Sequence, residues 1–123
     1  MAELLFWLYL TNAILLISHE IDSAYWKEWN LFKLPGGING FLLLHFPILL
    51  FVLYGLVLVY ANIQYGLFFS LLLALSGIFA FTAHTFFMLK GNEEFTTPVS
   101  IFILLSTLVV SAVQLSFTLA LLL

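Results

Sequence analysis

The three histidines, His19, His45 and His84, are the residues of this sequence best suited to chemistry. An imidazole can bind a metal ion or exchange a proton near neutral pH. His19 lies in the longest polar interruption in the first half of the chain, residues 18–29, next to Glu20. Imidazole nitrogen and carboxylate oxygen are ligands that suit Zn²⁺ or non-haem Fe²⁺. The residue types therefore predict a metal site.

The spacing of the histidines places them at one depth in a membrane. Eight residues separate His19 from Lys27, six separate His84 from Lys90, and His45 follows the start of a second apolar run by seven. At about 1.5 Å of helical rise per residue, these separations are roughly 9 to 12 Å. We therefore expect three imidazoles at one level, each from a different helix.

Each candidate residue is given a role in this site. Four side chains are assigned as metal ligands: His19, Asp22, His45 and His84. Glu20 is assigned as the catalytic acid or base acting on a metal-bound water, whose pKa the metal lowers towards 7. A lipid-like substrate would enter sideways from the bilayer, and three side chains are assigned to bind it: Ser23, Tyr25 and Ser100. Alternatively, Asp22 orients the His19 ring without touching the metal.

The same residues also have structural interpretations. A single histidine within a membrane helix is commonly a packed, hydrogen-bonded residue, and Glu20 and Asp22 lie where the chain can already be in water. The last apolar run carries a polar stripe that would serve either interhelical hydrogen bonds or a substrate path. Its members are Thr97, Ser100, Thr107, Ser111, Gln114 and Thr118.

Composition decides the environment of the helices that must position these side chains. Of 123 residues, 64% are hydrophobic and only 7% are charged, with a mean hydropathy of +1.20. Soluble domains carry about 25% charged residues, so the solvent of this chain must be lipid.

A net charge of −3 with three Lys or Arg excludes nucleic acid as a partner. The absence of Cys excludes disulfides and thiolate ligands.

Four apolar runs alternate with polar breaks that contain Gly, Pro or Asn. The last three are long enough to span a membrane, and the first becomes so if its helix continues towards Trp26. Backbone groups in lipid must bond within their own segment, which favours helices over strands. We predict an all-α, membrane-embedded antiparallel four-helix bundle forming a single transmembrane domain, residues 1–123. Its helices are expected at about 3–26, 38–60, 66–89 and 97–122, with an amphipathic interfacial connection at about 24–35. The N-terminal segment is expected to be a retained helix and not a cleaved signal.

The lysines predict the orientation of the bundle. Lys27, Lys33 and Lys90 all fall in the first and third connections, whereas the second connection and both terminal segments have no lysine or arginine. Connections rich in basic residues face the cytoplasm. We therefore expect a multi-pass protein of the cell membrane, with both termini on the non-cytoplasmic side and the histidines near the cytoplasmic side.

The layout of the polar residues resembles that of a known group of proteins. The cluster His19-Glu20-Ile21-Asp22 ends the first expected helix, and His45 and His84 lie singly on the next two. Over most of the chain this resembles a class of small, uncharacterised bacterial four-helix membrane proteins, and it is loosely similar to the HXXEE-motif membrane proteins. The sequence departs from that motif because Glu follows His directly. The resemblance implies a membrane location and a polar site, without an established reaction.

Three functions are compatible with these patterns. The first is a metal-dependent membrane enzyme with Zn²⁺ or Fe²⁺ acting on a lipid-like substrate. The second is a bundle that binds haem or a pigment through two histidines, favoured by an aromatic content of 18%. The third is a non-enzymatic membrane subunit or partner-binding protein, which as a transporter would have to oligomerise. The sequence leaves open whether the protein is an enzyme.

Overall fold

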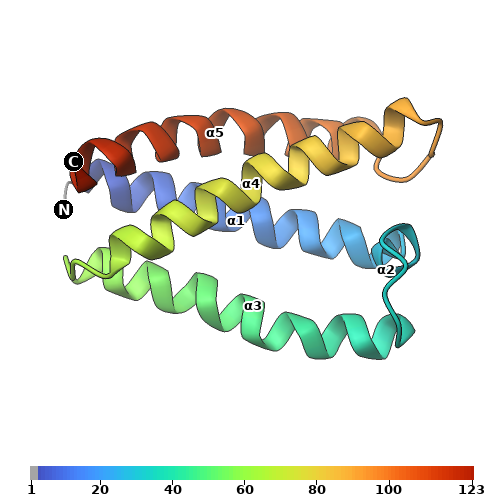
Figure 1. Ribbon diagram of the computed structural model, residues 1–123, viewed down its shortest axis with the longest axis horizontal. Coiled ribbons are helices and arrows are strands. Elements are labelled where there is room, and N and C mark those ends of the chain that lie inside the picture. Colours follow the sequence, from blue (N-terminus) through green and yellow to red (C-terminus); the bar gives the residue numbers. More distant parts are fainter. Residues whose placement is uncertain (1–2) are drawn as a thin grey trace.

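The structure, a computed structural model, describes residues 3–123 and consists of helices joined by short connections (Figure 1). Four helices are long and apolar enough to cross a membrane: α1 (Glu3–Tyr25), α3 (Gly37–Tyr60), α4 (Gly66–Leu89) and α5 (Pro98–Leu122). A short helix, α2 (Glu28–Leu31), lies between α1 and α3. The predicted all-α membrane bundle is confirmed, with successive long helices antiparallel and no strand in the described range. Met1 and Ala2, which precede the first expected helix, lie outside the described residues.

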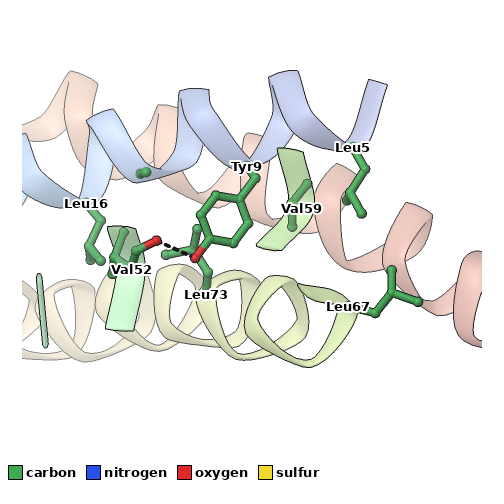
Figure 2. Close-up of a cluster of buried hydrophobic side chains, with 8 residues drawn as sticks. Leu5, Tyr9, Leu16, Val52, Val59, Leu67 and Leu73 are labelled. Carbon is green, nitrogen blue, oxygen red and sulfur yellow. Dashed lines mark hydrogen bonds between the residues drawn. The ribbon is translucent and has the colours of Figure 1, made fainter. Parts of the chain in front are cut away.

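One end of the bundle is closely packed around Tyr9 of α1. Figure 2 shows the Tyr9 ring among apolar side chains of α1, α3 and α4, with its hydroxyl pointing at the backbone of α3. This hydroxyl donates a hydrogen bond to the carbonyl oxygen of Val52, with an oxygen–oxygen distance of 2.7 Å. The contact requires Gly55, because an added Cβ would overlap both the Tyr9 hydroxyl and the Phe69 side chain. Helices α1, α3 and α4 are therefore held close together here.

A buried polar network joins α1, α4 and α5 in the middle of the bundle. The Asn12 amide donates to Gln114 Oε1 at 2.9 Å and to Ser111 Oγ at 3.1 Å. The Gln114 amide donates in turn to the carbonyl oxygen of Ser70 at 3.1 Å, and Ser70 Oγ pairs with Thr118 Oγ1 at 2.7 Å. Three members of the polar stripe thus make interhelical hydrogen bonds, which hold helices together where lipid offers no alternative partner.

Helices α4 and α5 approach each other closely at Gly77. A Cβ added there would overlap Ser111 Oγ and lie 3.0 Å from the Thr107 side chain. Small residues at such a crossing let two membrane helices come into backbone-level contact. In Figure 1, helix α3 diverges from α4 towards the end of the bundle that carries α2.

The α4–α5 contact gives a stability prediction. We expect Gly77→Val to lower the free energy of unfolding by about 1–3 kcal/mol, because the side chain has no space against α5. Unfolding in mixed detergent micelles, followed by circular dichroism, measures this change. The matched control is Ser76→Val, since Ser76 is exposed beside Gly77. Equal stability of the two variants would contradict the close contact.

Candidate metal site

The connection after α1 folds Glu28 back against the bundle. Helix α1 ends at Tyr25, and Lys27 adopts a left-handed conformation with φ 54° and ψ 55°. Helix α2 then begins at Glu28, whose side chain is only 18% exposed. The Ser23 hydroxyl lies 2.9 Å from Glu28 Oε2 and 2.8 Å from the carbonyl oxygen of His19, and its single proton serves one acceptor at a time. The turn therefore brings a carboxylate to the face of α1 that carries His19.

Two imidazoles from different helices meet at this carboxylate. His84 Nε2 of α4 donates a hydrogen bond to Glu28 Oε2 at 3.0 Å, and His19 Nε2 of α1 lies 3.7 Å from the same oxygen. The two rings contact each other edge to face, with centroids 4.7 Å apart. One potential ligand atom from each of the three side chains falls within 4.8 Å of the other two. His19, Glu28 and His84 therefore form a group that could hold a metal ion.

Aromatic side chains shield this group from water. Phe95, from the connection between α4 and α5, is fully buried, and its ring centroid lies 4.1 Å from that of His84 and 5.3 Å from that of His19. Phe32, which follows α2, packs edge-on against His84 at 5.9 Å. Phe95 has a φ of 65°, a left-handed conformation that is uncommon for a bulky residue. The apolar surroundings strengthen every electrostatic interaction inside the group.

The charge state of Glu28 follows from its neighbours. Burial by itself raises the pKa of Glu28, but the hydrogen bond and charge interaction with His84 lower it, as do Ser23 and His19. The net effect holds the pKa below the ordinary carboxyl value of 4.5. Glu28 is therefore an ionised carboxylate at neutral pH, which is the form that binds a metal.

Several polar atoms beside this group have no protein partner. His19 Nδ1, His84 Nδ1 and Asp22 Oδ2 are buried and make no hydrogen bond in the described part of the chain. A buried polar atom without a hydrogen bond costs free energy, and each such case calls for an explanation. These atoms mark a site at which a bound ion with its water ligands would lower the free energy.

The third histidine forms a separate pair with Glu20. His45 Nε2 of α3 lies 2.5 Å from Glu20 Oε2 of α1, and His45 Nδ1 lies 2.6 Å from the carbonyl oxygen of Phe41. Because Nδ1–H donates to that carbonyl, Nε2 either carries a second proton or accepts one from Glu20. A single proton is thus shared between an imidazole and a carboxylate. The structure brings His19 and His84 together but pairs His45 with Glu20 instead.

The remaining predicted site residues are not members of the His19–Glu28–His84 group. Asp22 is half-buried and is not part of the group. Ser23 contacts Glu28, as described above, while Tyr25 is 75% exposed at the end of α1. Ser100 is buried at the start of α5, where its backbone N–H donates to Thr97 Oγ1 at 3.1 Å. Their predicted roles as ligand and substrate contacts stay predictions.

Glu28 is the member of the group that the sequence did not reveal. Sequence patterns placed it in an amphipathic connection, among lysines and tryptophans typical of the membrane interface. The available signal was its position nine residues after His19 in a short connection rich in charge. That signal does not give the direction of the side chain, because the left-handed turn at Lys27 decides it.

These features define a multi-pass, all-helical membrane protein with a histidine–glutamate cluster at one end of its bundle. The chain belongs to a family of unknown function, DUF6713, whose model matches residues 5–121. This agrees with the expectation of an uncharacterised family, while the similarity to HXXEE-motif proteins stays a prediction. Comparison with curated proteins and comparison with solved structures each gave no match.

The lowered pKa of Glu28 predicts acid-sensitive stability in the metal-free protein. Ionised Glu28 stabilises the folded state above the ordinary carboxyl pKa, and this contribution is lost as the pH falls below about 4.5. We expect Glu28→Gln to cost about 2 kcal/mol at neutral pH, the value of a hydrogen bond to a charged group, and less in acid. Unfolding in mixed micelles with a chelator, from neutral pH to pH 3, measures the difference.

The control for this experiment is Glu93→Gln, because Glu93 is exposed in the connection between α4 and α5. We expect this variant to keep the acid sensitivity of the wild type. A Glu28→Gln protein that loses as much stability on acidification as the wild type would contradict the assignment.

Proposed function

We propose that this protein binds a transition metal, Zn²⁺ or Fe²⁺, through His19, Glu28 and His84, and that the metal supports an enzymatic reaction on a lipid-like substrate. The observation that carries the proposal is the convergence of the two Nε2 atoms on Glu28 Oε2, at 3.0 and 3.7 Å. Metal–ligand bonds of 2.0–2.1 Å at tetrahedral angles separate neighbouring ligand atoms by about 3.4 Å. The two distances bracket that value, so a metal needs only small side-chain movements.

The composition of the group favours a catalytic over a purely structural metal. Two histidines and one glutamate leave at least one coordination position for water or substrate, which is typical of catalytic zinc and of non-haem iron sites. A metal held there would act as a Lewis acid and would lower the pKa of its bound water. Glu20 and its partner His45 are the groups that we assign to proton transfer, since they already share one proton.

This assignment replaces two of the ligands expected from the sequence. Glu28 takes a ligand position. His45 is assigned as the proton-sharing partner of Glu20, and Asp22 has a supporting role next to His19.

A haem or pigment site is less well supported. The rings of His19 and His84 are in direct contact, and Phe95 packs against both. A macrocycle with these two histidines as axial ligands would have to separate them.

Metal analysis of the purified protein tests the proposal. We expect about one zinc or iron per chain in the wild type, and loss of at least about tenfold in affinity for added Zn²⁺ in His84→Ala and Glu28→Gln, because losing even a group that only orients a ligand costs about 10–100-fold. The discriminating variant is His45→Ala, which should keep the metal because His45 lies outside the group. Folding of each variant is checked by circular dichroism.

Two outcomes would overturn this metal site. Folded wild-type protein that binds neither Zn²⁺ nor Fe²⁺ would remove the metal from the proposal. Loss of metal in His45→Ala with retention in Glu28→Gln would return the ligand set to the one expected from the sequence.

The site is proposed to lie on the cytoplasmic side. Lys27 and Lys33 flank α2, and Lys90 follows α4. All three lysines therefore lie at the end of the bundle that carries the His–Glu group, which is the His19–Glu28–His84 group. Because the chain has no cysteine, single cysteines report the orientation. We expect Glu93→Cys to resist a membrane-impermeant maleimide in intact cells and Gln64→Cys, at the opposite end, to react. The reverse pattern would place the site outside.

A further inference from the structure

A cavity of about 730 Å³ lies between α1, α3 and α4, beside the His–Glu group. Its polar end is formed by His19, Glu20, Glu28 and His84. Apart from Ser76, every other lining residue is apolar. Its volume is in the range of about 300–1,000 Å³ that holds one drug-sized ligand. The cavity is therefore a largely apolar chamber that borders the carboxyl and imidazole groups.

The chamber opens towards the hydrocarbon of the membrane. Leu44 of α3 and Phe79 of α4 line it and are 47% and 65% exposed, which places them on the lipid-facing surface. In Figure 1, α3 and α4 lie close together near residues 60–66 and diverge towards α2. A large apolar space that is continuous with lipid is filled by a hydrocarbon chain, because water there would have few hydrogen-bonding partners.

The polar end restricts the head of the molecule that carries this chain. It offers two carboxylates and two imidazoles, and no Lys or Arg lines the chamber. Glu20 has one oxygen committed to His45, which leaves its second oxygen as an acceptor. An ionised carboxylate such as Glu28 accepts hydrogen bonds and donates none, so it favours a head that donates a hydrogen bond and repels an anionic head.

We infer that the chamber binds a single-chain amphiphile with an uncharged hydroxyl head, of the long-chain alcohol or monoacylglycerol class. The chain lies between α3 and α4, and the hydroxyl reaches the Glu20 and Glu28 end. Binding requires no metal, but the role of this molecule as substrate rests on the proposed function. Its oxygen would then lie beside the ligand position that the protein leaves open.

Photolabelling in phosphatidylcholine nanodiscs tests this site. The probe is hexadecanol carrying a diazirine in its chain, and the competitors are unlabelled hexadecanol and palmitic acid, each added with and without EDTA. We expect labelled residues on the facing sides of α3 and α4. With EDTA, palmitate should compete at least about tenfold more weakly than hexadecanol at pH 8, because ionised Glu28 repels an anionic head in a low-dielectric site.

A second test uses variants that fill the chamber with a larger side chain. Ala80 lies in its wall, and Ala80→Phe should reduce labelling by at least about tenfold while preserving zinc binding, because the ring occupies the space of the chain. Ala83→Phe, in the same wall, is the second variant, for use if the first does not fold. The matched control is Ala112→Phe, on the exposed surface of α5, which should label like the wild type.

The outcomes separate this inference from the metal proposal. Labelling that is equal in wild type and in a folded Ala80→Phe or Ala83→Phe variant would overturn the chamber. Equal competition by palmitate and hexadecanol in EDTA would overturn the uncharged head. Specific labelling of protein that binds no zinc would support the amphiphile site and contradict the metal site. An increase of palmitate affinity on adding Zn²⁺ would support both the amphiphile site and the metal site.

Discussion

The hydrogen bonds of Gln114 are the constraint on which the rest of the structure depends. This one side chain joins α1 through Asn12 and α4 through Ser70, and it is completely buried. In lipid, an amide without partners is costly, so the network fixes how α1 and α4 are rotated about their axes. His19 lies two turns from Asn12, and His84 lies four turns from Ser70, on the same helix faces. The convergence of the two imidazoles follows from this rotation.

Helix α3 is held differently, and that difference creates the chamber. Its second half packs against α1 and α4 through Gly55 and the hydrogen bond between Tyr9 and Val52. Its first half is linked to α1 by the pair of His45 with Glu20 and to α2 by the contact of Phe41 with Trp29. In Figure 1, this half of α3 diverges from α4. The space left beside α4 has its polar end at the two carboxylates.

The His–Glu group is a compact set of polar side chains among aromatic ones. Glu28 keeps its negative charge because His84, His19 and Ser23 outweigh the effect of burial on its pKa. Phe95 and Phe32 close the group from the connections, so the loops contribute as much to the site as the helices do. Polar groups in a low dielectric are expensive unless paired, and three buried atoms that stay unpaired in the described residues belong to His19, Asp22 and His84, in this group or beside it. These are the physical grounds for expecting a ligand here.

The sequence by itself determined the all-helical membrane fold and the number of long helices. Four long apolar runs in a chain with 7% charged residues favour helices in lipid, because a helix pairs its backbone groups within one segment. The sequence also indicated that the polar stripe containing Ser111, Gln114 and Thr118 faces the interior, because helical periodicity fixes which residues share a face. What only the tertiary structure decided was which polar groups meet. His45 shares its depth with His19 but faces Glu20, since depth does not fix the direction of a side chain across the bundle. Glu28 reaches the two imidazoles only through the left-handed turn at Lys27, a backbone conformation that residue type alone does not specify.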